Sequence, residues 1–211
     1  MYHWVSFRRP PIRRRLSHHR SWIRWLALVL LLAIGLPGAA SQGGSQILWR
    51  NANGDMVIWF MSDGAITSSA DLGVVPAGWT IQAMADFNGD HQPDILWRNT
   101  NGDVVIWFMS GGAIASSANL GVVPSNWTVQ GTGDFDGDGD ADILWRNANG
   151  DVVIWFMKGG TINSSADFGV VPAIWTVQGT GDFNGDTKSD ILWRNAYGDV
   201  VVWFMSGGTV A

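Results

Sequence analysis

One four-residue sequence occurs four times in this chain at a fixed spacing. Ile-Leu-Trp-Arg begins at residues 47, 95, 143 and 191, so each copy starts 48 residues after the copy before it. A constant period in the range of roughly 20–50 residues is typical of a chain built from one structural unit repeated in tandem. The sequence therefore predicts a repeat architecture, with units that start near these four residues.

The first forty residues lie outside the repeat pattern. They hold seven arginines and no acidic residue, then an apolar run over 25–36 and small residues over 38–40. This order is typical of a secretory signal peptide. A retained membrane anchor is the alternative, but the apolar run is short of the roughly 20 residues that span a bilayer. We expect residues 1–40 to be a cleaved signal peptide and residues 41–211 to be a repeat domain, secreted or at the cell surface, with no membrane span after cleavage.

The charge of the repeat domain comes almost entirely from aspartate. All 18 acidic residues lie after residue 40, every one is Asp, and six basic residues accompany them, which gives a net charge of 6 − 18, or −12. Such a surface repels phosphates, which argues against nucleic acid and anionic lipid as partners. Asp favours turns and compact oxygen cages, whereas Glu favours helices. The chain has no cysteine, so bound cations are candidates for stabilising the fold in place of disulfides.

One unit, over 127–172, shows how each repeat is organised. Turn residues separate four segments with β-strand character, at 127–130, 143–146, 151–157 and 161–171. Four short antiparallel strands in about 48 residues is the size of one β-propeller blade. Both faces of the third segment are apolar, and blades packed face to face cover both. The expected fold is all-β: tandem four-stranded antiparallel blades of a β-propeller, in a partial or small ring of about 3.5 repeats.

The Asn149-Gly150 pair sets an expected register between the second and third strands. If these are the central residues of a two-residue hairpin, Leu144 faces Trp155 and Arg146 faces Val153. Arg146 would then lie diagonal to Trp155, within reach of its ring. A partly buried arginine needs such an aromatic neighbour or a carboxylate.

Three acidic loops precede the last three Ile-Leu-Trp-Arg copies. Counted from the first Asp of each loop, positions 1, 3, 5 and 9 carry oxygen side chains, while the residue type at position 7 varies, as expected if only its backbone carbonyl serves. Ca²⁺ binds six to eight oxygens at roughly 2.3–2.6 Å, and a curled loop with alternating acids supplies them from one side. We expect about three Ca²⁺ sites. The candidate ligands are Asp86, Asn88, Asp90, Gln92 and Asp94, then Asp134, Asp136, Asp138, Asp140 and Asp142, then Asp182, Asn184, Asp186, Lys188 and Asp190, with Gln92, Asp140 and Lys188 acting through the backbone carbonyl.

Other readings of these loops are an EF-hand, a magnesium site or a turn without metal. An EF-hand needs Gly at position 6 and Glu at position 12, and position 12 here is Trp in each loop. Magnesium prefers a stiffer octahedron with several waters. An Asx-rich hairpin can form without any metal, and it is the alternative to a calcium loop.

The loop sequence Asp-Phe-Asn/Asp-Gly-Asp, followed by Asp-Ile-Leu-Trp-Arg, resembles the FG-GAP/VCBS-type repeat. The resemblance covers residues 47–211. Better-known members form the integrin-α-like β-propeller, and the resemblance implies calcium coordination by positions 1, 3, 5, 7 and 9 of a hairpin between the first two strands of each blade. Two features depart from the family: a compact unit with a tryptophan-rich strand, and a low copy number beside seven-bladed rings.

The end units of the repeat domain look incomplete. The first copy lacks an opening strand and an acidic loop, and the last stops where a fourth strand should begin. A small closed ring, an assembly of two chains and a fragment of a longer array are the three alternatives. We expect an arc of blades rather than a closed ring, with exposed apolar ends that favour self-association.

No catalytic constellation stands out, so we expect a binding protein and not an enzyme. After residue 40 there is one histidine, His91, which we interpret as a solvated turn residue, and there is no Cys or Glu. The favoured function is an exported calcium-binding β-propeller repeat module for extracellular or cell-surface binding or adhesion, with an extracellular protein or glycan as partner. One alternative is a multivalent lectin that uses the repeated tryptophans, which we otherwise interpret as core. Another is an accessory arm or fragment of a larger secreted enzyme.

Overall fold

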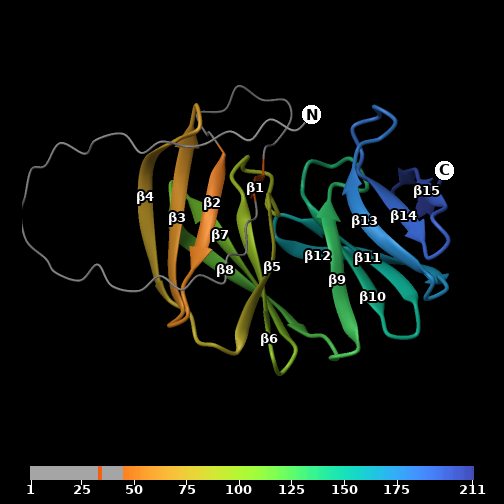
Figure 1. The fold of residues 1–211 in the computed structure, drawn as a ribbon, viewed down its shortest axis with the longest axis horizontal. Helices are drawn as coiled ribbons and strands as arrows, with labels where there is room; N and C mark the ends of the chain where they lie inside the picture. Colours follow the sequence, from red (N-terminus) through yellow and green to blue (C-terminus); the bar gives the residue numbers. More distant parts are fainter. Residues whose placement is uncertain (1–32, 35–44) are drawn as a thin grey trace, which may run out of the picture.

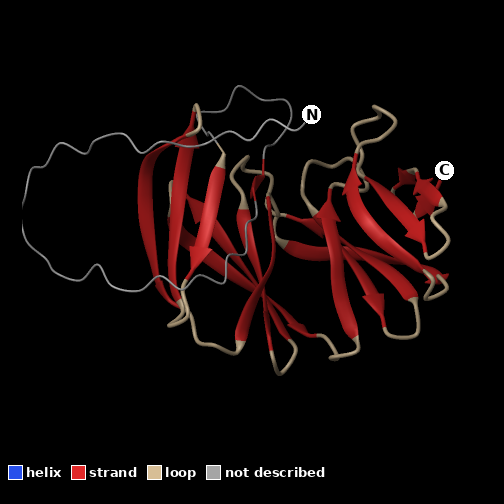
Figure 2. Ribbon diagram, viewed as in Figure 1, coloured by secondary structure: helices blue, strands red, loops and turns tan. Residues whose placement is uncertain are grey.

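The computed structural model describes residues 33–34 and 45–211, and these residues form only strands, turns and loops (Figure 2). The expected signal peptide lies outside the described residues, apart from the two-residue strand β1. Within the described part of the chain, no helix is long and apolar enough to cross a membrane.

Four antiparallel sheets follow one another along the chain, and in each of them the strands lie in sequence order. Blade 1 consists of β1 (Ala33–Ile34), β2 (Gln46–Arg50), β3 (Asp55–Ser62) and β4 (Ala65–Val74). Blade 2 consists of β5 (Trp79–Ala85), β6 (Asp94–Asn99), β7 (Asp103–Ser110) and β8 (Ala113–Val122). Blade 3 consists of β9 (Trp127–Gly133), β10 (Asp142–Asn147), β11 (Asp151–Lys158) and β12 (Thr161–Val170). Blade 4 consists of β13 (Trp175–Gly181), β14 (Asp190–Asn195) and β15 (Val200–Trp203), and the small sheet of β16 (Met205–Ser206) and β17 (Thr209–Val210) follows it.

The predicted all-β fold of tandem four-stranded antiparallel blades is confirmed. The blades stand side by side in an arc, and blades 1 and 4 lie at its opposite ends (Figure 1). The first strands of blades 2, 3 and 4 contact one another in series, β5 with β9 and β9 with β13. The described residues thus form an arc rather than a closed ring, as expected from the incomplete end units.

The turn between the second and third strands of blade 3 holds three residues and not two. The side-chain oxygen of Asn147 accepts hydrogen bonds from the backbone N–H groups of Asn149 and Asp151, at 2.8 and 3.0 Å. Gly150 has φ +98°, and a Cβ there would lie 2.4 Å from the carbonyl oxygen of Val171. Glycine is therefore required for both the backbone conformation and the close approach.

This longer turn corrects the predicted register by one residue. Leu144 pairs with Ile154 and Arg146 pairs with Val152. The prediction assumed a two-residue Asn-Gly turn. The side-chain amide of Asn147 instead closes a loop of three residues, and the extra residue shifts the strand pairing by one. The predicted contact of Arg146 with Trp155 was also wrong. The Arg146 guanidinium lies over Trp193 of blade 4, with Cζ 5.5 Å from the ring centroid.

The hydrophobic core lies between consecutive blades, with one cluster at each of the three junctions. The second-strand tryptophans Trp97, Trp145 and Trp193 are each about 1% exposed and face the preceding blade. Their burial supports the interpretation of these tryptophans as core. Blades 2 and 3 thus bury both apolar faces because a neighbour covers each of them on either side, whereas blades 1 and 4 each bury one.

Candidate metal centre

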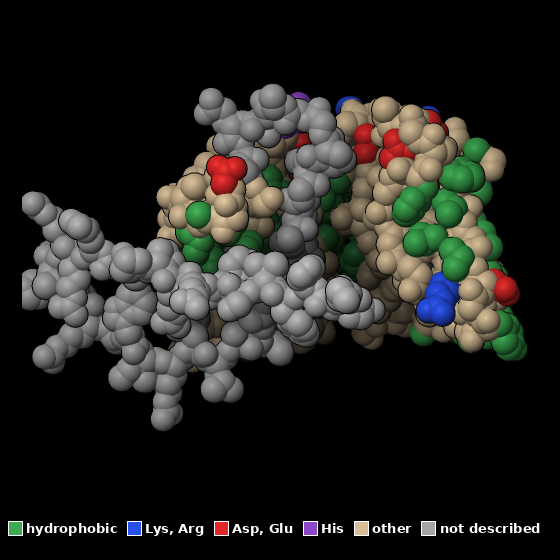
Figure 3. All heavy atoms as spheres, turned by 45° about the horizontal axis from the view of Figure 1, so that its top comes forward, with side chains coloured by type: hydrophobic (Ala, Val, Ile, Leu, Met, Phe, Trp, Pro, Cys, Tyr) green, Lys and Arg blue, Asp and Glu red, His purple; other side chains and the backbone are tan. Residues whose placement is uncertain are grey.

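The three acidic loops connect the first and second strands of blades 2, 3 and 4. They lie between β5 and β6, between β9 and β10, and between β13 and β14. This is the position that the resemblance implied. Figure 3 shows acidic side chains gathered along the upper edge of the molecule, where these connections lie.

In the loop of blade 3, the first aspartate organises the backbone. Asp134 Oδ1 accepts hydrogen bonds from the N–H groups of Gly137 and Asp138, at 2.6 and 3.1 Å, and Oδ2 accepts one from Gly139, at 2.9 Å. Gly137 and Gly139 have φ of +83° and +95°, which glycine adopts without a steric penalty. The loop is therefore curled by its own hydrogen bonds, in the manner of an Asx turn.

The loops of blades 2 and 4 have the same curl but carry a non-glycine residue at position 6. His91 N–H donates to Asp86 Oδ2 at 2.7 Å, and Thr187 N–H donates to Asp182 Oδ2 at 2.9 Å. His91 and Thr187 have φ of +64° and +72°, a region that residues other than glycine seldom adopt and that β-branched residues such as Thr187 adopt most rarely. The His91 side chain is 80% exposed, which confirms its interpretation as a solvated turn residue.

The ninth position of each loop carries a fully buried aspartate. Asp142 Oδ2 accepts a hydrogen bond from Phe135 N–H, and Oδ1 accepts one from Met157 N–H, both at 2.8 Å. Asp94 and Asp190 make the equivalent pair of bonds in blades 2 and 4. This carboxylate therefore fastens the loop to the end of the third strand, a role that its spacing did not reveal.

Burial changes the acidity of two of these carboxyl groups. Desolvation raises the pKa of Asp142 to about 8, although the backbone hydrogen bonds from Met157 and Phe135 oppose the rise. Desolvation likewise raises the pKa of Asp94 to about 7. Nearby aspartates raise both pKa values further, so a bound cation would favour the charged form of these groups.

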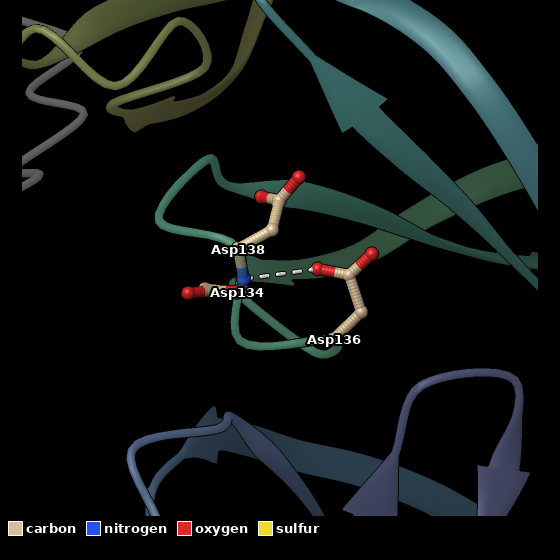
Figure 4. A group of neighbouring side chains, drawn as sticks. All are labelled: Asp134, Asp136 and Asp138. Atoms are coloured by element: carbon tan, nitrogen blue, oxygen red, sulfur yellow. Dashed lines mark hydrogen bonds between the residues drawn. The ribbon is translucent and has the colours of Figure 1, made fainter.

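Three carboxylates come together in the loop of blade 3 (Figure 4). One oxygen each of Asp134, Asp136 and Asp138 lies within 4.8 Å of the others. Burial and the charge of Asp138 raise the pKa of Asp136. Burial alone would raise the pKa of Asp138, but the hydrogen bond and charge of Lys158, together with the backbone N–H of Asp140, lower that pKa overall. These hard oxygen donors on a curled loop fit a Ca²⁺ ion.

A basic side chain is already in contact with this group. Lys158 Nζ lies 2.9 Å from Asp138 Oδ2 at the start of the turn between β11 and β12. The corresponding residues of the other blades are Ser62, Ser110 and Ser206. Among the described units, only the third has a basic residue at this position of the turn, and its charge competes with a cation for Asp138.

The loops of blades 2 and 4 carry Asn at position 3, so each offers two carboxylates and one amide near its rim. Asn88 Nδ2 donates to Asp90 Oδ2 at 3.5 Å, and Asn184 Nδ2 donates to Asp186 Oδ2 at 3.2 Å. The amide nitrogens face the neighbouring carboxylates, so a cation there needs the amides turned to present oxygen. Among the described residues, only the blade 3 loop therefore assembles three acidic groups.

Position 7 has a side-chain role that the sequence reasoning missed. Gln92 Oε1 accepts a hydrogen bond from Gly111 N–H at 2.8 Å, and Asp140 Oδ2 accepts one from Gly159 N–H at 2.6 Å. Gly111 and Gly159 lie in the turns between the third and fourth strands, so position 7 links the loops of blades 2 and 3 to their own blades. The recurring Gly-Gly pair after the third strand was the available signal.

Neighbouring acidic loops are also joined to each other. Ala141 N–H donates to the carbonyl of Asp86 at 2.7 Å, and Ser189 N–H donates to the carbonyl of Asp134 at 2.6 Å. The three loops therefore form one continuous row across blades 2, 3 and 4. Their relative positions are fixed by backbone contacts as well as by the packing of the blades beneath them.

One family of repeats matches the part of the chain that holds the acidic loop of blade 3. Residues 134–193 match the model of the FG-GAP-like repeat. Among solved structures, the chain is similar to the crystal structure of BBS1N in complex with ARL6DN, soaked with mercury, at 14% sequence identity and a TM-score of 0.41. That similarity covers 76% of this chain and 46% of the other. No curated protein sequence matches the chain.

Proposed function

This chain carries FG-GAP-like repeats that fold as the blades of a β-propeller, and we propose that it is an exported calcium-binding module for extracellular or cell-surface binding or adhesion. The observation that carries the proposal is the group of Asp134, Asp136 and Asp138 on the curled loop of blade 3. Three carboxylates within 4.8 Å repel one another, and a divalent cation removes that repulsion.

In the proposed site of blade 3, Asp134, Asp136 and Asp138 hold the cation through their side chains and Asp140 through its backbone carbonyl. Asp142 completes the set proposed from the sequence, and its present partners are two backbone N–H groups. The equivalent positions of the other two loops make up the second and third sites. The bound ion would supply positive charge that fixes the carboxylates in place and stiffens the hairpin.

The proposed partner is an extracellular protein or glycan, bound along the row of acidic loops. Loops held by a rigid scaffold are common recognition surfaces, and here backbone hydrogen bonds keep neighbouring loops in register. The arginine-rich leader supports export. The excess of aspartate after residue 40 supports a partner other than nucleic acid.

Titration calorimetry of the purified chain with CaCl₂ tests this function. We expect saturable binding, with Asp136→Ala removing the site of blade 3 and the others retained. Asp167→Ala is the matched control, because Asp167 lies on β12 outside the loops and should leave binding unchanged. Absence of calcium binding, or equal loss in both variants, contradicts the proposal.

Carbohydrate binding is a second candidate function, supported by equivalent apolar pockets in two blades. One pocket is lined by Trp79, Trp97 and Trp107 of blade 2 with the Val74–Pro76 segment. The other is lined by the matching residues of blade 4. Tryptophan rings stack on sugars, and repetition gives avidity. A glycan array with the chain in EDTA tests it: calcium-independent binding to defined sugars favours this candidate over the first.

A further proposal is that the chain is an accessory arm of a larger secreted enzyme. The test is whether an adjoining reading frame continues the 48-residue pattern.

A further inference from the structure

Each blade has two apolar faces with different residues. The forward face, which packs on the next blade, is formed in blade 3 by Phe135, Leu144, Val152, Ile154 and Phe156. The rear face, which packs on the preceding blade, is formed in blade 4 by Ile191, Trp193, Trp203 and Met205. Blades 1 and 2, and blades 2 and 3, meet through the residues at the same places in their repeats. One type of junction is therefore used three times.

The forward face of blade 4 is apolar and exposed. Phe183 is 50% exposed and Val200 is 59% exposed, whereas their counterparts in blade 3, Phe135 and Val152, are both 0% exposed. Figure 3 shows apolar side chains at the end of the molecule that blade 4 forms. Isolated apolar residues are common on protein surfaces, but this patch consists of the residues that form a buried junction in the other blades.

The arginine that completes a junction is present on this face as well. Arg146 is half-buried, and its guanidinium lies over Trp193 of the next blade. Arg194 occupies the same place in blade 4 and is exposed. The forward face of blade 4 therefore contains both the apolar surface and the cation that contact a tryptophan in the other junctions.

The rear face of blade 1 offers the matching surface. Ile47, Trp49 and Met61 are half-buried, whereas the corresponding Ile95 and Trp97 of blade 2 are 0% and 1% exposed. The residue types are the same because the positions lie 48 residues apart. No sheet from the described part of the chain packs on this rear face.

The tryptophan pair on the rear face of blade 1 already has the geometry found at the internal junctions. The rings of Trp49 and Trp59 are 4.7 Å apart between centroids, with planes inclined at 52°. The corresponding pair in blade 2, Trp97 and Trp107, is 4.9 Å apart and inclined at 57°. The surface that receives an arginine is thus preformed in blade 1.

We propose that the forward face of blade 4 binds the rear face of blade 1 in a second copy of the chain, with Arg194 over Trp49 of that copy. The contact is head to tail, because two different faces meet. Two arcs of four blades, joined twice in this way, form a closed ring of eight blades, at the upper end of the range of about 4–8 known for propellers. A second copy fits this surface because it presents the residue types that already complete three junctions within one chain.

Light scattering on the purified full-length chain tests the proposal, with the molar mass measured across concentrations. We expect twice the mass of one chain. Val200→Asp alters the forward face of blade 4 and Ile47→Asp alters the rear face of blade 1, so each variant alone should be monomeric. Val122→Asp is the matched control, since Val122 is 66% exposed on β8 and belongs to neither face. Circular dichroism and melting confirm that each variant is folded.

A mixture of the two monomeric variants distinguishes head-to-tail association from a symmetric contact between identical faces. Each variant retains the face that the other has lost, so the mixture has one intact junction and should recover a dimer. A symmetric contact between two blade 4 faces would leave Ile47→Asp dimeric. A monomeric native chain, a dimer that survives both substitutions, or a mixture that stays monomeric would each overturn the proposal.

Discussion

The guanidinium of Arg146 lies over the ring of Trp193 in the next blade and also donates hydrogen bonds to the chain that connects the two blades. Its acceptors are the carbonyl oxygens of Val171, Pro172 and Trp175, at 2.7, 3.1 and 2.5 Å. Arg50 and Arg98 make the same contacts at the two preceding junctions. One arginine per repeat therefore fastens each blade to the next.

We predict that Arg146→Lys destabilises the protein although it keeps the charge. A lysine ammonium cannot reach three carbonyls and stack on an indole with the planar fork of arginine. Loss of charged hydrogen bonds and of the cation–π contact should lower the free energy of unfolding by about 2–3 kcal/mol. Urea unfolding measures the change.

The control for this prediction is Arg194→Lys, made in a chain that also carries Val200→Asp. Arg194 is exposed at the end of the arc, so its replacement should change the free energy of unfolding by less than about 0.5 kcal/mol. Equal losses for the two arginine substitutions would show that the contacts at the junction do not matter.

We predict that the buried carboxylate at loop position 9 stabilises the fold, in addition to its proposed role as a cation ligand. Asp142→Asn leaves one of the N–H groups of Phe135 and Met157 facing an amide N–H₂, because Asn has only one acceptor oxygen. We expect the free energy of unfolding in EDTA to fall by about 2–4 kcal/mol. Asp136→Asn, which removes a charge from the rim, should leave it unchanged or raise it.

The stability of the cation-free protein should depend on pH with a defined sign. Burial raises the pKa of Asp142 to about 8 and that of Asp94 to about 7, above the ordinary value of 3.8. Between these values the native state retains protons that the unfolded chain has released, so unfolding free energy falls as pH rises from about 4 to about 8. Urea unfolding at pH 5, 6.5 and 8 in EDTA measures it. A stability that rises over this range would contradict the assignment.

Lys158 is predicted to weaken cation binding at the loop of blade 3. Its ammonium lies 2.9 Å from Asp138, where a cation would bind. Lys158→Ser introduces the residue found in the other three blades, and we expect calcium affinity at this site to rise roughly threefold at low salt. Lys158→Arg should retain the native affinity. Titration calorimetry compares the two variants.

The fold could be predicted from the sequence because its main signals are local and repeated. The Ile-Leu-Trp-Arg spacing gives the unit, and the apolar residues on both faces of the third strand require covered blades. The loop that begins at Asp134 lies between the first and second strands of its blade, as the resemblance implied. These inferences needed only the residues of one repeat and the spacing between its copies.

The features that sequence reasoning missed depend on contacts between segments. The register of β10 and β11 depends on the Asn147 side chain, which accepts two backbone N–H groups. The partners of Arg146 lie in the connection to the next blade and in that blade itself. Asp142 looked like a ligand by spacing alone, and its bond to Met157 joins residues 15 positions apart. Spacing gives neighbours along the chain, but not contacts across a sheet.

In the proposed function, divalent cations bound by the acidic loops stabilise the tandem blades. The most direct test is the melting temperature of the purified chain, measured first in EDTA and then with excess CaCl₂. We predict a lower melting temperature in EDTA and its recovery when calcium is restored, with a smaller recovery in Asp136→Ala than in Asp167→Ala. A melting temperature indifferent to both EDTA and calcium would contradict the account.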